Sequence, residues 1–428
     1  MKILSLMKKK YRSSDHKVVR DLNFEYFKGD FAQIDGSVNA VGSQTLAKVG
    51  TVIRSTGDMA RLGGTAITSG GDIAPYMAST GFQNRGILTG LFEAVGGLFG
   101  MNDRALVEGI QVTSNSIVSA NRGNVFGDGT DGFGSLGKLR NKFFKWNGLN
   151  GWVASLKNSM ALGLARFYGI KADQKFSSLE LRERNFLTLY GIDEGKWDML
   201  RSIKTIAVDD KRYLTAEAAL DIPDSVVNKY VGRKLSAREL RNFKNDLELT
   251  WRNVLSDQGT HGTPEPDTQI RSITNMGTVK GTGLGEANRF IMQYKNFAVS
   301  LYKKILLREM QSYGPDESKL IGAAMIASTL MLGTIFGYLV ITTKDLLSGR
   351  SPRDPKKLSV IMQSFVQGGG GGIYGDFLMS EIQNQYGNGI LETVAGPTAS
   401  DIKKFTDMVR TMNEPKKAGK KFLQLAEG

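Results

Sequence analysis

The sequence contains no cysteine, and this absence sets the first limits on what the protein can do. Without thiols the chain forms neither a disulfide framework nor a thiolate metal site. Histidine is almost missing too, because the 2 histidines, His16 and His261, lie far apart in the sequence. No acidic residues stand in a recognisable catalytic frame. The sequence therefore predicts no catalytic residue, no metal site and no cofactor.

Acidic residues are in short supply relative to basic ones. The chain has 56 Lys and Arg against 42 Asp and Glu, which gives a net charge of +14 and a pI near 9.6. Such a surplus favours anionic partners such as nucleic acid or an anionic membrane face, although it also serves plain solubility. The basic residues that we predict to contact DNA or another anion are Lys8, Lys9, Lys10, Lys142, Lys145, Lys416, Lys417, Lys420 and Lys421.

Long apolar runs are absent except for one, from Ile321 to Thr343, which has no charged residue. As a helix it would be roughly 34 Å long, enough for a bilayer core of about 30 Å. Three interpretations remain open: a buried core helix or hairpin of a soluble assembly, a span that inserts conditionally, or a constitutive anchor. Four small residues in the run and the two lysines that flank it are the predicted helix-packing and membrane-contact residues: Ala323, Ala327, Gly333, Gly337, Lys319 and Lys344.

Proline is scarce at 9 residues, whereas glycine is abundant at 51. This composition and the apolar spacing predict a mostly α-helical protein with Gly-rich loops and one membrane-length apolar helix. Ser177-x-x-Glu180 and Ser236-x-x-Glu239 have the pattern of capping boxes that begin helices. The predicted organisation is a basic arm with a Gly/Ala-rich helical region at 1–137, a helical domain at 138–258, a linker at 259–268 and a C-terminal helical region at 269–428.

Several weaker patterns have a structural and a functional interpretation. The apolar run Gly86–Phe99 suits a core helix or an interfacial segment. Residues 138–152 interleave basic and aromatic side chains, which suits an amphipathic helix end or contact with single-stranded nucleic acid. The Gly/Asp-rich loop at 123–137 is expected to be a loop or hinge rather than a calcium site, because it has one copy and no bidentate glutamate. The glycines before the helix near 286 match no phosphate-loop spacing.

The C-terminal half resembles a known protein family. Four stretches carry most of the resemblance: RFIMQYKNFAVSL (289–301), GYLVITTKDLLSGRSP (337–352), GGGGGIYGDFLM (368–379) and GPTASDI (396–402). These look like the C-terminal region of the large internal virion proteins, or ejection proteins, of short-tailed bacteriophages. RSTGDMARLGGTAITSGGDIA (54–74) is similar to another part of the same proteins.

The resemblance implies a protein that is stored inside the virion as part of an oligomeric core near the portal. During infection such a protein would leave the capsid and help to build a conduit for phage DNA across the host periplasm and inner membrane. The implied partners are copies of the same chain, other core, portal or tail proteins, phage DNA and host lipids. Family members can carry a transglycosylase domain, but this chain shows no such signature, so that activity would lie outside it. Two alternatives remain: a DNA-binding packaging protein without membrane action, and a cell-wall-degrading virion enzyme.

Overall fold

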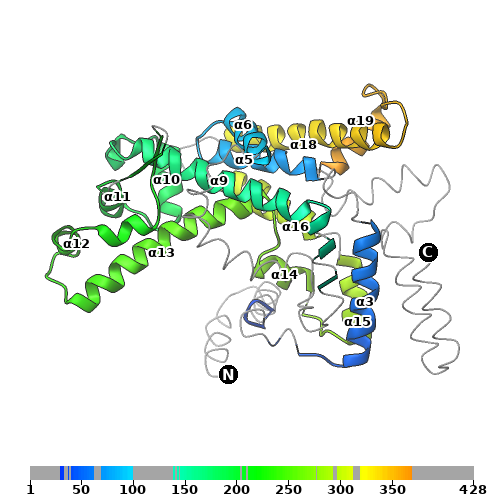
Figure 1. Cartoon of the computed structure of the whole chain (residues 1–428), viewed down its shortest axis with the longest axis horizontal. Coiled ribbons are helices and arrows are strands. Elements are labelled where there is room, and N and C mark those ends of the chain that lie inside the picture. Colours follow the sequence, from blue (N-terminus) through cyan, green and yellow to red (C-terminus); the bar gives the residue numbers. More distant parts are fainter. Residues whose placement is uncertain are drawn as a thin grey trace.

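The computed structural model describes residues 29–99 and 138–368, with gaps at 33–36, 38–39, 62–68, 140–141, 144, 203–204, 209–210, 276, 293–295 and 312–318. Within these residues the protein is mostly α-helical, as the sequence predicts, and strand is confined to one small hairpin. Strands β1 (Ile206–Val208) and β2 (Lys211–Tyr213) pair antiparallel. The helices fall into three groups: a scaffold, an upper layer and a lower group (Figure 1).

The scaffold is built on two long helices, α9 (Leu149–Lys171) and α13 (Ala237–Gly262). The shorter helices packed around them are α10 (Leu181–Leu189), α11 (Glu194–Arg201) and α12 (Asp224–Val231). Their shared core contains four aromatic side chains that are almost fully buried: Tyr168, Phe186, Trp197 and Trp251. Ring-to-ring contacts of Tyr168 with the other three join α9 to α10, α11 and α13.

Helix α13 begins as its sequence predicts. The hydroxyl of Ser236 accepts a hydrogen bond from the Glu239 amide, and the Glu239 carboxylate accepts one from the Ser236 amide. The other predicted box is wrong by three residues, because α10 begins after Glu180, whose amide donates to the Glu183 carboxylate. Glu183 is fully buried and ion-paired with Lys171 of α9, so this packing contact fixes where α10 begins.

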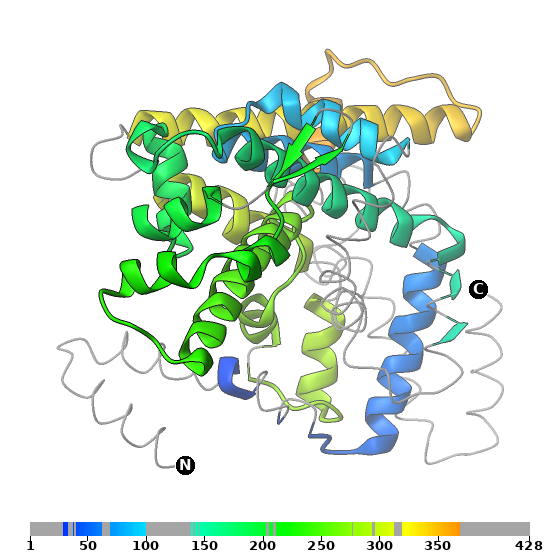
Figure 2. The same ribbon diagram turned by 60° about the vertical axis from the view of Figure 1, so that its left-hand side comes forward.

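The upper layer contains α5 (Ile73–Phe82), α6 (Ile87–Leu98), α18 (Lys319–Leu347) and α19 (Leu358–Gln367). A short 3₁₀ turn, η2 (Ser69–Asp72), leads into α5. Helix α5 is buried along its whole length and separates α18 from the scaffold helices α9 and α13. Both views place α18 along the upper edge of the molecule (Figures 1 and 2).

The lower group consists of α3 (Gln44–Arg61), α14 (Thr268–Asn275) and α15 (Gly283–Met292). A buried ion pair between Arg54 of α3 and Glu286 of α15 joins its two longer helices. Helix α16 (Asn296–Leu301), the π-helical turn η6 (Tyr302–Leu306) and α17 (Leu307–Gln311) lead from this group toward the upper layer.

The linker predicted at 259–268 is corrected in part. Helix α13 continues to Gly262, and Thr263, Pro264 and Glu265 are buried rather than exposed to solvent. The Glu265 carboxylate pairs with Lys157 Nζ of α9 at 2.6 Å, so this stretch is tied to the scaffold. The two prolines end the helix but do not create a free connection.

Candidate membrane-contact surface

Helix α18 contains the apolar run of the sequence and extends beyond both of its ends. Its 29 residues give a length of about 44 Å. Among the described residues it is the one helix long and apolar enough to cross a membrane, and 28% of its most apolar window is buried. Most of this window is therefore not buried by the part of the chain that the structure describes.

Helix α18 is apolar on its outer face as well as on its inner face. The inner face, which packs against α5 and α19, combines small or polar residues (Gly322, Thr329, Gly333, Gly337 and Asp345) with buried Val340 and Ile341, and Leu332 and Phe336 also pack inward. The outer face carries large apolar side chains with high exposed fractions: Leu320 76%, Met331 65%, Ile335 50%, Leu339 51% and Leu346 58%. Helices that pack in lipid show this arrangement, because small residues allow close backbone contact and large ones face the acyl chains.

Helix α19 lies antiparallel against α18 at a very short separation. A Cβ atom placed on Gly337 would overlap the Ser364 carbonyl oxygen, and one placed on Gly368 would overlap the Gly333 carbonyl. Glycine at these positions is what lets the two backbones meet. We call residues 319–367 the α18–α19 hairpin.

The loop of the hairpin, residues 348–357, is basic and is joined to α18 through Arg353. Asp345 is 2% exposed, and its carboxylate accepts hydrogen bonds from Arg353 Nε at 2.9 Å and Nη2 at 3.1 Å. The Tyr338 hydroxyl donates to the Arg353 carbonyl oxygen at 2.8 Å. Lys356 and Lys357 remain exposed at the end of the loop. A fixed basic loop beside an apolar surface matches the charge of anionic lipid headgroups.

The structure separates the predicted helix-packing residues into two groups. Gly333 and Gly337 pack against α19 of the same chain, whereas Ala323 and Ala327 are exposed on α18. Lys319 is the first residue of α18, and Lys344 Nζ donates to Gln367 Oε1 of α19 at 3.3 Å. The pair of glycines thus closes the hairpin, and the alanines are free to meet another molecule.

The predicted anion-contact residues are described only in part. Lys142 and Lys145 are exposed just before α9, next to Trp146, which is 85% exposed. The remaining members lie outside the described residues: Lys8, Lys9, Lys10, Lys416, Lys417, Lys420 and Lys421. The Gly/Asp loop at 123–137 lies outside them as well.

The glycines before α15 have a structural task. Gly281 has φ +75°, and its amide donates to the buried Glu286 carboxylate at 2.7 Å. A carboxylate at this position repels a phosphate group, so the loop does not suit nucleotide binding. Among the described residues no cluster of His, Cys, Asp or Glu could hold a metal ion.

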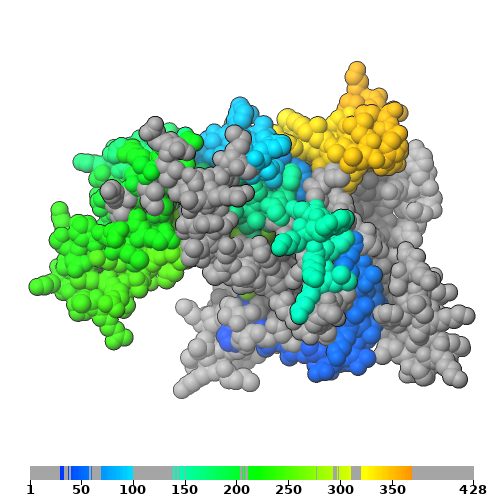
Figure 3. All heavy atoms as spheres, viewed as in Figure 1, coloured from blue at the N-terminus to red at the C-terminus, as the bar shows by residue number. Residues whose placement is uncertain are grey.

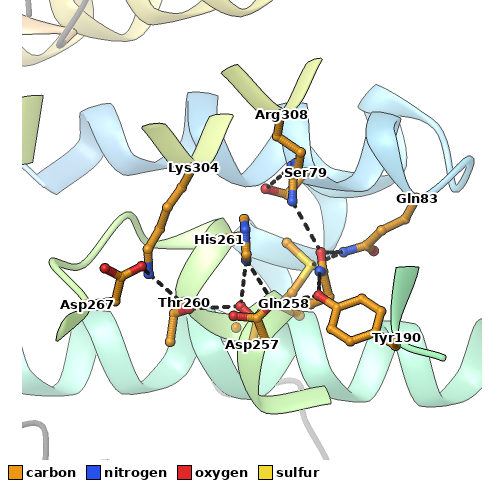
Figure 4. A network of polar contacts seen from close by, with 12 residues as sticks. Ser79, Gln83, Tyr190, Asp257, Gln258, Thr260, His261, Asp267, Lys304 and Arg308 are labelled. Atoms are coloured by element: carbon orange, nitrogen blue, oxygen red, sulfur yellow. Dashed lines mark hydrogen bonds and ion pairs between the residues drawn. The ribbon is translucent and has the colours of Figure 1, made fainter. Parts of the chain in front are cut away.

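A buried polar junction connects the scaffold to the segment that precedes α18 (Figure 4). Gln258 of α13 is its centre: its side-chain oxygen accepts from Gln83 Nε2 of α5 at 2.7 Å and from Arg308 of α17 at 3.4 Å. Its amide nitrogen donates to the Tyr190 hydroxyl at 2.6 Å, and that hydroxyl donates to the Asp257 carboxylate. No sequence pattern predicts this junction, although Gln258 is a polar residue in the helical register of the apolar stripe of α13.

The π-helical turn η6 contributes a second link to the same junction. Lys304 Nζ lies 3.3 Å from Thr260 Oγ1 and 3.8 Å from the Asp267 carboxylate. Arg308, one turn later, donates to Ser79 Oγ at 3.2 Å and covers the Phe82 ring. π-Helical turns are rare and occur often where a helix serves a function. The turn here directs both cations into the junction, so α5, α13 and α17 are held together by charge and hydrogen bonds.

His261 makes this junction sensitive to acid. Burial, with the neighbouring Arg308 cation, lowers its pKa to about 4, although the nearby Asp257 acts in the opposite direction. The unfolded chain binds a proton near pH 6.5, so between pH 6.5 and 4 the unfolded state carries more protons than the folded state. Stability at this site is therefore present above pH 6.5 and is lost as the pH falls toward 4.

Replacing His261 by Gln is expected to flatten the acid dependence of stability. The neutral amide cannot titrate, so the variant lacks the loss of on the order of 3 kcal/mol that the histidine contributes on acidification. Chemical denaturation of both proteins at several pH values between 7 and 4 measures the difference. Burial next to Glu265 raises the pKa of Asp72 to about 7, so protonation of Asp72 on acidification stabilises the folded state. This contribution is the same in both proteins and cancels when their stabilities are compared. Parallel pH profiles would contradict the assignment.

Comparisons with protein-family models, with curated proteins and with solved structures found no match.

Proposed function

We propose that the α18–α19 hairpin inserts into a lipid bilayer. The observation that supports this role is the outer face of α18, where leucine, isoleucine and methionine side chains have high exposed fractions. In water this outer face is costly, at about 25 cal/mol for each Å² of exposed apolar surface. A bilayer removes that cost without requiring a specific protein partner.

The resemblance to phage ejection proteins supplies a biological setting for this activity. In that setting the chain is a structural component of the virion interior, and other copies or core proteins cover the outer face of α18 before infection. After ejection, lipid of the host inner membrane would replace those neighbours, and an oligomer of the chain would form part of a conduit for phage DNA. Portal or tail proteins are further partners in this proposal, and cleavage of murein would belong to another chain.

Vesicle binding tests the proposed function directly. The full chain is mixed with vesicles of phosphatidylethanolamine and phosphatidylglycerol that contain a self-quenching dye, and flotation and dye release are measured together. We expect the protein to float with the vesicles and to release the dye. The absence of flotation, or flotation without release, would overturn the proposed conduit.

The basic loop gives this experiment a charge-dependent prediction. Reversing Lys356 and Lys357 to Glu is expected to weaken binding to anionic vesicles by at least about 2 kcal/mol, or about 30-fold, since each lysine near such a surface contributes about 1 kcal/mol. Lys229→Glu/Lys234→Glu is the matched control, because it changes the net charge equally at the exposed end of α12, far from α18 (Figure 1). Equal weakening by both variants would show that only net charge matters.

DNA binding without membrane action is the second candidate, and exposed Trp146 with Lys142 and Lys145 favours it. An exposed indole among cations can stack on an unpaired base while the cations contact phosphate. A protein that binds single-stranded DNA with a steep salt dependence and ignores vesicles would establish this candidate in place of the first.

A further inference from the structure

Helix α6 also exposes large apolar side chains, independently of α18. Its outward side chains Leu88, Phe92 and Val95, with Phe99 at its C-cap, are exposed, and the exposed fractions reach 74% for Phe92 and 80% for Phe99. A surface helix of a soluble protein places its charged residues outward and its large apolar residues inward. Phenylalanine side chains exposed to this extent on one helix face mark a contact surface.

The one charged residue of α6 points into the protein. Glu93 forms an ion pair with Arg85, which is almost fully buried, and it accepts a hydrogen bond from the Tyr76 hydroxyl at 3.2 Å. The inner face also meets its neighbours closely: a Cβ on Gly90 would collide with Thr80 and Met77 of α5, and the Gly97 carbonyl accepts a hydrogen bond from Ser155 of α9. The outer face therefore offers no charge for a protein or nucleic-acid partner to pair with.

The outer face of α6 is near that of α18. Leu91 and Leu98 of α6 pack into the same apolar cluster as Leu332 and Phe336 of α18, so the two helices share one inner core. Their atoms lie next to each other along the upper edge of the molecule (Figure 3). A bilayer that receives α18 is therefore within reach of α6.

We propose that the outer face of α6 inserts into the acyl chains of one leaflet of the bilayer that α18 enters. This inference rests on the proposed function and adds a second contact element to it. The 12 residues of α6 are about 18 Å long, close to the thickness of one leaflet at about 15 Å and far short of a full span. Helix α6 is thus too short to cross the bilayer and contacts one leaflet beside α18, which crosses both.

Site-specific fluorescence tests the proposal on the full chain. Because the protein has no cysteine, single cysteines at Phe92 and Phe99 can be labelled with the polarity-sensitive dye NBD without background. Met331→Cys reports on α18, and Leu189→Cys, on an exposed residue of scaffold helix α10, is the control. We expect vesicles to raise NBD emission several-fold at 92, 99 and 331 but not at 189. Lipids that carry nitroxides on their acyl chains should quench the dye at 92, 99 and 331 but not at 189.

Each alternative outcome has one meaning. Quenching at 331 without quenching at 92 and 99 would overturn the role of α6 and leave the proposed function intact. No quenching at any of the three sites would overturn both. Emission at 92 and 99 that rises with protein concentration in the absence of lipid would assign this face to a second copy of the chain and likewise overturn the proposal.

Discussion

The double substitution Ile335→Glu/Leu339→Glu is expected to abolish vesicle binding. Both side chains are half exposed on the outer face of α18, so in water the carboxylates are solvated and the fold is kept. At the centre of a bilayer each acidic residue costs about 2.5 kcal/mol or more. Together they should lower the partition coefficient at least 10³-fold, as measured by flotation over a range of lipid concentrations.

The control for this experiment is Leu189→Glu/Leu249→Glu. It adds the same charge at two exposed leucines of scaffold helices α10 and α13, which the proposed orientation keeps in water. Circular dichroism of both proteins shows whether the fold is intact. If the control loses binding as strongly as the α18 variant, the effect is one of net charge. Unchanged binding of the α18 variant would mean that this helix does not enter lipid.

Replacing Gly337 by Leu is expected to separate α19 from α18. The new side chain would occupy the space of the Ser364 carbonyl, and overpacking against backbone costs about 1–3 kcal/mol or more. Helix α19 has 10 residues and is too short to be stable alone. Hydrogen exchange of its amides should therefore accelerate by at least about tenfold, while the amides of α13 keep their protection.

Ala327→Leu is the matched control for the hairpin, because it enlarges a small residue on the exposed face of the same helix. Its α19 amides should exchange at the wild-type rate. Equal exchange rates of α19 in the two variants would show that the glycine contact does not hold the hairpin closed.

Local patterns in the sequence predicted local structure well. The helical class, the Ser236 cap of α13 and the apolar helix at 321–343 depend on neighbouring residues, and the structure confirms them. The cap at Ser177 and the linker at 259–268 were misplaced because long-range contacts decided them. Glu183 is fixed by Lys171 of α9, and Glu265 by Lys157 of the same helix.

The candidate site could be predicted only in outline. The glycines of α18 could be identified from the sequence, but the helix that packs against them could not. Helix α19 follows a basic loop, and no pattern in that loop predicts that the chain folds back against α18. Gln83 and Gln258 are separated by 175 positions, and no periodicity links them. The outward orientation of Phe92 and Phe99 is likewise a property of packing, since α6 is apolar on both sides and only the contacts of Glu93 decide which side is inner.

A depth profile along α18 shows whether this helix crosses a bilayer. Single cysteines at Leu320, Ala327, Met331, Ile335, Leu339 and Leu346 are labelled with NBD and quenched by lipids that carry nitroxides at different depths. A helix that crosses the bilayer gives the greatest depth near Met331 and Ile335 and shallow positions at both ends. A uniform shallow depth, or labels that lipid does not quench, would contradict insertion and would return α18 to a protein interface within a soluble assembly.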